Sequence, residues 1–206
     1  MIKFLLQLML SCLLCLMLAG CISSKYVERK QYLFDTQKEA VNKTAKTYSC
    51  SVFIDHVAAE PPFDQLDFLY RIKSGQYLVD YYHGFFVPPT EQLDSILGTY
   101  LDISGKFNVD VTELPTSKNK LKVKLIELYA DYRDRDNPRA VITLNFLLTK
   151  LVDDKTVVLL DKALRSSVVL KEKNTDSLLR AWNVGIQDIL KQAIGILNSK
   201  SNCLAP

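Results

Sequence analysis

An apolar run at the N-terminus, which ends at Cys21, constrains this chain more than any other feature of its sequence. Lys3 precedes the run, and nearly every residue from Phe4 to Leu18 is apolar. A helix of about 15 residues is roughly 22 Å long, whereas a transmembrane helix needs about 20 residues. The run is therefore typical of the hydrophobic region of a secretory signal peptide, and we expect the protein to be exported.

The residues that close this run are Leu18, Ala19, Gly20 and Cys21. They resemble the lipobox of bacterial lipoproteins, and the resemblance implies that the Cys21 thiol is diacylated and that the chain is cut just before it. Ile22 follows, in place of the aspartate that is associated with retention in the inner membrane, so the outer membrane is expected. The alternative is an ordinary signal peptide or a short uncleaved anchor, with Cys21 a plain thiol.

The residues after the lipobox divide into a short tether and one domain. Residues 22–30 are polar and have no regular period, and at about 3.3 Å per residue they reach roughly 30 Å. The rest of the chain has the apolar content and the length of one globular domain. The expected organisation is a signal peptide over 1–20, a lipidated tether over 21–30 and a single domain over 31–206.

The charge balance excludes one class of partner. Lys and Arg number 26 against 23 Asp and Glu, for a formal net charge of +3. No basic cluster with interleaved aromatic residues is present of the kind that follows a nucleic-acid backbone. We therefore expect no nucleic-acid partner.

Two cysteines remain for disulfide chemistry if Cys21 carries lipid. Cys50 lies in the first predicted core strand and Cys203 in the C-terminal tail. Exported proteins meet an oxidising environment, where a Cys50–Cys203 disulfide can form. The alternative is two separate thiols.

The hydrophobic pattern predicts short strands and two amphipathic helices. A helix is expected after Pro88-Pro89, because apolar residues from Leu93 to Leu101 fall on one helical stripe; the apolar stripe from Leu178 to Leu197 predicts the second. Alternating and β-branched runs predict strands over 31–35, 48–55, 68–73, 76–83, 107–111, 121–131, 140–151 and 156–170. This order predicts one α+β domain, with a mixed, mostly antiparallel sheet and both helices packed on one face.

The strand predicted over 121–131 changes phase in its middle. Leu121, Val123 and Leu125 share one face, and the apolar residues from Ile126 to Ala130 then fall on the other. The change indicates either a β-bulge or a strand that leaves one packing surface for another.

No constellation for catalysis or metal binding is found in the sequence. His56 and His83 each lack a second ligand at metal-binding spacing, so we expect solvated histidines. Asp131, Asp134 and Asp136 lack the glycine and the later glutamate of a calcium-binding loop, so we expect a solvated hairpin tip. The sequence therefore predicts no enzyme, no metal and no cofactor.

An aromatic cluster precedes the first predicted helix. On a regular strand, Tyr77 and Tyr81 would share one face, and we expect both in the core. Tyr82, Phe85 and Phe86 are predicted to form a partner interface, because an apolar surface left uncovered on a sheet is a candidate contact site.

The segment from Phe68 to Phe107 contains, in order, the motifs Tyr70-Arg71, Tyr81-Tyr82, Pro88-Pro89 and Ser104-Gly105-Lys106-Phe107. In this order they resemble the central part of the ABC-type transport auxiliary lipoproteins, the PqiC-like family. Two positions depart from the family pattern, since Phe86 stands where the family has a tryptophan and Phe85 where a basic residue is common.

The resemblance implies a fold like the N-terminal domain of TolB and a role without chemistry. Such a lipoprotein would serve an MCE-type system that moves lipid between membranes. Its partners would be an MCE-domain tunnel protein with its ABC permease, the outer membrane and identical subunits in a ring. Two alternatives stay open: an envelope-assembly accessory similar to LptE or TolB, and a periplasmic module that binds a small ligand.

Overall fold

The computed structural model describes residues 1–4, 7, 27–36, 50–110 and 118–200. The lipobox and Cys203 lie outside the described residues. The described elements are β1 (Lys30–Tyr32), β2 (Cys50–Ile54), β3 (Ala58–Ala59), β4 (Asp67–Lys73), β5 (Gln76–Phe85), α2 (Pro89–Ile103), β6 (Phe107–Asp110), β7 (Asn119–Asp131), β8 (Arg139–Val152), β9 (Lys155–Val169) and α3 (Thr175–Lys200).

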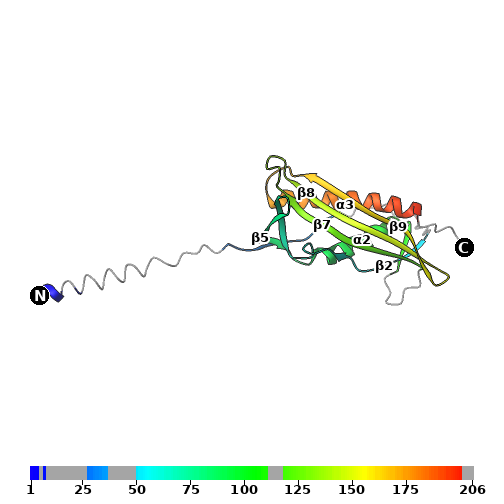
Figure 1. Cartoon of the computed structure of the whole chain (residues 1–206), viewed down its shortest axis with the longest axis horizontal. Coiled ribbons are helices and arrows are strands. Elements are labelled where there is room, and N and C mark those ends of the chain that lie inside the picture. The colour runs from blue at the N-terminus through cyan, green and yellow to red at the C-terminus, as the bar shows by residue number, and fades with distance from the viewer. Residues whose placement is uncertain (5–6, 8–26, 37–49, 111–117, 201–206) are drawn as a thin grey trace.

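The strands form one mixed sheet organised around β7 (Figure 1). One edge of β7 pairs with β8, which pairs with β9, and both of these long ladders are antiparallel. Along its other edge β7 pairs with β2, β3 and β4 in short parallel ladders. The β4–β5 hairpin and β1 extend this side, and β6 flanks β2. The predicted α+β fold is confirmed.

Both described helices pack on one face of this sheet and share one hydrophobic core with it. α2 contributes its predicted stripe, including Leu97 and Leu101, and α3 runs along β8 and β9. A Cβ atom at Gly185 would lie only 3.2 Å from a methyl carbon of Ile142 and 3.1 Å from the hydroxyl of Ser166. Glycine at this position therefore lets α3 lie close against the two strands.

A β-bulge explains the phase change in β7. The register with β8 shifts between Leu125 and Glu127. Because one residue is added, Leu128 and Ala130 return to the core face that Leu121 and Leu125 already occupy. The strand thus stays on one packing surface along its whole length.

Candidate functional site: the exposed face of β5

A second bulge, in β5, decides where the aromatic cluster lies. Asp67 pairs with Gly84 and Leu69 with Val79. Between these two pairs the chain advances five residues along β5 but only two along β4. The Asp80 carboxylate fills the bulge, where it accepts hydrogen bonds from the backbone N–H groups of Tyr82 (2.8 Å) and His83 (3.1 Å).

The Asp80 carboxylate also binds the bulge to the neighbouring strand. The Tyr70 hydroxyl donates a 2.6 Å hydrogen bond to Asp80, and the Nδ1 atom of His83 lies 2.8 Å from the same carboxylate. Burial alone would raise the pKa of Asp80, but hydrogen bonds from Tyr70, Tyr82 and His83 outweigh it and hold the pKa below its ordinary value. Burial and this hydrogen bond raise the pKa of Tyr70. Asp80 is therefore held as a carboxylate that fixes the bulge.

The bulge places Phe85 in the core, so its predicted place in a partner interface is wrong. Phe85 is only 2% exposed. Its ring centroid lies 4.6 Å from that of Phe68, 5.7 Å from that of Trp182 and 5.0 Å from that of Phe34. Three additional residues reverse the alternation of the strand, which turns Phe85 to the helix-covered face.

The same bulge corrects the prediction for Tyr81. Tyr81 was expected in the core, yet it is 76% exposed. Tyr82 is 45% exposed, and the two rings meet edge to face at 5.3 Å. We call Val79, Tyr81 and Tyr82 the β5 surface. Phe86, 64% exposed, lies just beyond the strand. The interface role of Tyr82 and Phe86 stays a prediction.

The edge of β5 next to this surface has little strand pairing. β1 pairs with β5 only at His83, Gly84 and Phe85, and no other described strand adds to this edge. An exposed edge strand with apolar side chains is a common place for another chain to bind. The described residues before Lys30 leave the domain at the end where β5 stands (Figure 1).

An open groove lies on the other side of the same hairpin. Its volume is about 480 Å³. The rings of Tyr70 and Tyr132 meet edge to face at 5.6 Å in its wall, and burial raises the pKa of Tyr132. We call it the hairpin groove; its lining residues are Tyr70, Ile72, Leu78, Tyr132, Arg135 and Lys173.

The sheet face opposite the helices carries a small cluster of its own, which the sequence pattern did not reveal. Tyr129 is fully buried there, with Leu69 and Val141. The Arg71 guanidinium lies between the rings of Tyr77 and Tyr129, at 5.8 and 5.6 Å from their centroids. A two-residue turn at Ser74-Gly75 would pair Arg71 with Leu78. A register shift between Arg71 and Lys73 pairs Arg71 with Tyr77 instead, so the sequence carried no signal for this contact.

Charged groups complete that cluster. Glu127 accepts hydrogen bonds from Thr143 (2.7 Å) and from Arg165 (3.1 Å), and Arg71 donates one to the Tyr129 hydroxyl (3.1 Å). Burial raises the pKa of Glu127, but these hydrogen bonds lower it further than burial raises it. Glu127 and Arg165 are therefore paired on this face of the sheet.

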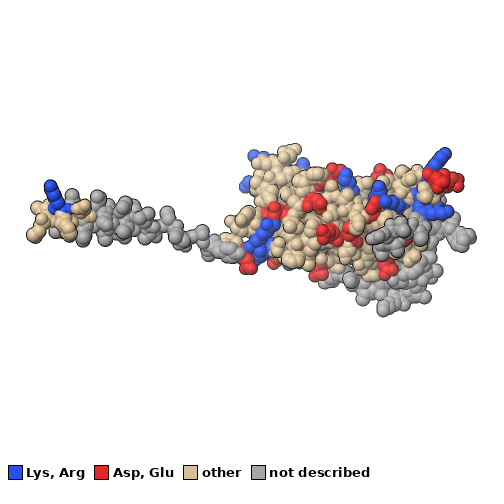
Figure 2. Space-filling model, turned by 90° about the horizontal axis from the view of Figure 1, so that it is seen from below, with Lys and Arg blue, Asp and Glu red and all other residues tan. Residues whose placement is uncertain are grey.

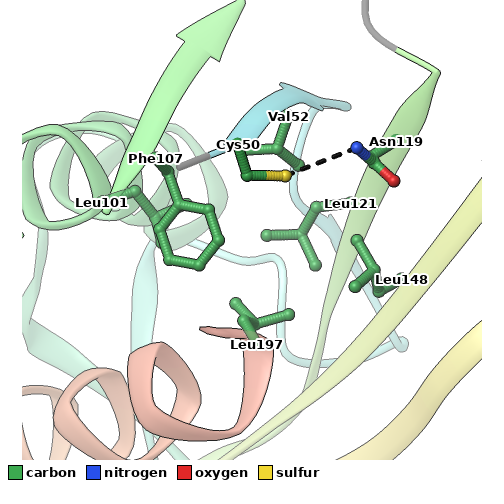
Figure 3. Close-up of a pocket in the computed structure, with 8 residues that line it drawn as sticks. All are labelled: Cys50, Val52, Leu101, Phe107, Asn119, Leu121, Leu148 and Leu197. Carbon is green, nitrogen blue, oxygen red and sulfur yellow. Dashed lines mark hydrogen bonds between the residues drawn. The ribbon is translucent and has the colours of Figure 1, made fainter. Parts of the chain in front are cut away.

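A cavity beside Cys50 is too small for a ligand. It lies between α2, α3 and the sheet, and its volume is about 10 Å³, enough for one water molecule (Figure 3). The Asn119 side chain donates a 3.4 Å hydrogen bond to the Cys50 sulfur. Cys50 is disulfide-bonded, and Cys203 lies outside the described residues, so the Cys50–Cys203 pairing stays a prediction.

The described residues show no group of three or more His, Cys, Asp or Glu side chains that could hold a metal ion. The side chain of His56 is 98% exposed, with its Nδ1 atom 3.2 Å from Asp94. His83 serves the β5 bulge, as described above. At the hairpin tip, Asp131 pairs with Arg133, and Asp134 accepts hydrogen bonds from the turn.

Acidic and basic side chains are interspersed on the face that Figure 2 shows. Within the described part of the chain, no helix has both the length and the hydropathy to cross a membrane.

Comparison with known proteins supports the fold. No family model matches the sequence, and no curated protein matches it. The structure is similar to that of a Xanthomonas campestris protein described as a member of the DUF330 family, with a TM-score of 0.66 at 18% identity over 84% of this chain and 95% of the other. An uncharacterised protein gives a TM-score of 0.62 at 14% identity over 84% and 98% of the two chains. A hypothetical protein of Chlamydia trachomatis gives 0.53 at 10% identity over 74% and 98%.

Proposed function

We propose that this chain is an outer-membrane lipoprotein that acts as a non-catalytic auxiliary component of an MCE/ABC-type system for lipid transport between membranes. The observation that carries the proposal is the β5 surface, which leaves Tyr81 and Tyr82 uncovered on a thinly paired strand edge. Tyrosine is enriched where proteins bind one another, because its ring offers apolar area and its hydroxyl a polar contact.

The sequence motifs agree with this role. The lipobox at Leu18–Cys21 would fix the protein to the membrane, and the tether would hold the domain within roughly 30 Å of it. The order of the motifs from Tyr70-Arg71 to Phe107 resembles the PqiC-like family. On this reading the β5 surface contacts an MCE-domain tunnel protein or its permease, and identical subunits assemble into a ring.

Affinity purification of the full-length tagged protein from membranes, after mild crosslinking, tests the proposal. The expected result is an MCE-domain protein and an ABC permease among the co-purified proteins, identified by mass spectrometry. A β-barrel protein in their place would overturn the proposal in favour of an envelope-assembly accessory. A monomer that carries only lipid would overturn it in favour of a binding module.

A variant with Cys21→Ala provides the matched control for membrane attachment. The variant is expected to appear in the soluble periplasmic fraction, while the native protein stays with the outer membrane. Equal fractionation of the two would contradict the lipid anchor.

A further inference from the structure

We infer that the hairpin groove binds an acyl chain of an anionic phospholipid from the membrane to which the protein is anchored. The inference rests on the lipid anchor in the proposed function, but not on the identity of the transport partners. Four residues give the groove its apolar wall, Tyr70, Ile72, Leu78 and Tyr132. Its volume of about 480 Å³ lies within the roughly 300–1,000 Å³ of ligand sites in proteins.

The groove lies beside the start of α3. Tyr70 and Tyr132 pack against the main core, on the face that the helices cover. α3 starts at Thr175, two residues after Lys173 of the lining, so the groove lies beside the first turn of the helix. Leu78 pairs with Tyr70 across the hairpin and is 51% exposed, although it is apolar.

The charges at the groove fit an anionic head group. Both charged residues in the lining, Arg135 and Lys173, are basic. Among the described residues Arg135 makes no ion pair, and Lys173 makes only a long one of 3.8 Å to Asp136, whose side chain is 94% exposed. Asp134 is engaged by the backbone of its own turn. A phosphate beside an acyl chain would therefore meet two cations at the edge of an apolar wall.

The position of the tether brings this groove to the membrane. β1 runs parallel to the last residues of β5, so the chain before Lys30 leads back along β5 toward Leu78, and it leaves the domain at the end where β5 stands (Figure 1). The residues between Cys21 and Lys30 can span roughly 30 Å at most. The hairpin is therefore the part of the domain that the anchor holds near the lipid surface.

The test uses the full-length lipidated protein reconstituted in vesicles of phosphatidylglycerol and phosphatidylcholine that contain a phospholipid with a photoactivatable acyl chain. The anchor holds every variant on the vesicle, so crosslinking inside the groove reports the groove itself. We expect crosslinks on peptides that contain Leu78 or Tyr132. Leu78→Asp should lower them about tenfold, because a charge replaces the apolar contact between Leu78 and the acyl chain.

Two further variants keep the test decisive. Arg135→Glu combined with Lys173→Glu changes only exposed side chains and should also lower the crosslinks about tenfold, more in phosphatidylglycerol than in phosphatidylcholine alone. Val158→Asp, at a residue of β9 that is 58% exposed, should leave them unchanged. Equal crosslinking in the native protein, Leu78→Asp and the double variant would overturn the inference.

The two proposals can fail separately. If no MCE-domain protein or permease co-purifies but lipid crosslinks to the groove, the proposed function is contradicted and this inference is supported. If the partners co-purify but no lipid crosslinks to the groove, this inference is contradicted and the proposed function is supported.

Discussion

Two aromatic groups lie on the same strand, and the domain uses them in opposite ways. Phe85 is buried among Phe68 and Trp182, whereas Tyr81 and Tyr82 are exposed a few residues earlier. Both groups are rich in apolar ring area, so composition does not separate them. The bulge held by Asp80 separates them, because it changes the face of the sheet on which each residue lies. One carboxylate can therefore decide which half of an aromatic segment becomes core and which stays on the surface.

The largest effect is expected from the loss of the buried Phe85 ring, and the exposed Tyr81 ring provides the comparison. Phe85→Ala should lower the free energy of unfolding by about 3–5 kcal/mol, because it opens a cavity between buried rings. Tyr81→Ala should change it by less than about 0.5 kcal/mol, since its ring is exposed. Urea titration followed by circular dichroism measures both. Similar losses in the two variants would show that Tyr81 also belongs to the core.

A glycine substitution tests whether the chain is tightly packed just after the bulge. A Cβ atom at Gly84 would lie 2.5 Å from the backbone oxygen of Leu66, so Gly84→Ala should lower the free energy of unfolding by about 1–3 kcal/mol. Gly98, within α2, is the matched control, because a Cβ atom there meets nothing within 4 Å. Gly98→Ala should stabilise the protein by up to about 1 kcal/mol. Chemical denaturation of both variants provides the measurement, and a neutral Gly84→Ala would contradict the close packing.

The carboxylate of Asp80 gives a pH dependence. Its pKa is lowered in the folded protein, so its stabilising effect is complete above the ordinary aspartate pKa of about 3.9 and is lost as the pH falls through the folded-state value. Asp80→Asn should lower the free energy of unfolding by about 1–2 kcal/mol at neutral pH. The difference between native and variant protein should shrink below about pH 4. A difference that is constant from pH 7 to pH 3 would contradict the role of the charged form.

The sequence was sufficient for the elements whose periodicity is strong. The apolar stripes from Leu93 to Leu101 and from Leu178 to Leu197 predicted both helices, and the phase change near Leu125 indicated the bulge in β7. These features are local, since a residue's neighbours along the chain carry the signal.

The β5 bulge and the surfaces it creates could not be predicted in the same way. The role of Asp80 has no signal in its own segment, because the hydroxyl of Tyr70 that completes its hydrogen bonds comes from another strand. The expectations of Tyr81 in the core and Phe85 in the interface assumed a strand without this bulge. The hairpin groove likewise combines β4, β5 and the segments around Tyr132 and Lys173, which only the folded chain brings together.

Co-purification of a variant with an altered β5 surface tests whether this surface binds a partner. The combined variant Tyr81→Ser and Tyr82→Ser, in the full-length anchored protein, should lose co-purified partner by at least about tenfold while the urea midpoint stays that of the native protein. The matched control is Val157→Ser with Val158→Ser, at residues of β9 that are 43% and 58% exposed, and it should retain the partner. Full retention of the partner by the tyrosine variant, or equal loss in both variants, would contradict the claim that the β5 surface is the contact site.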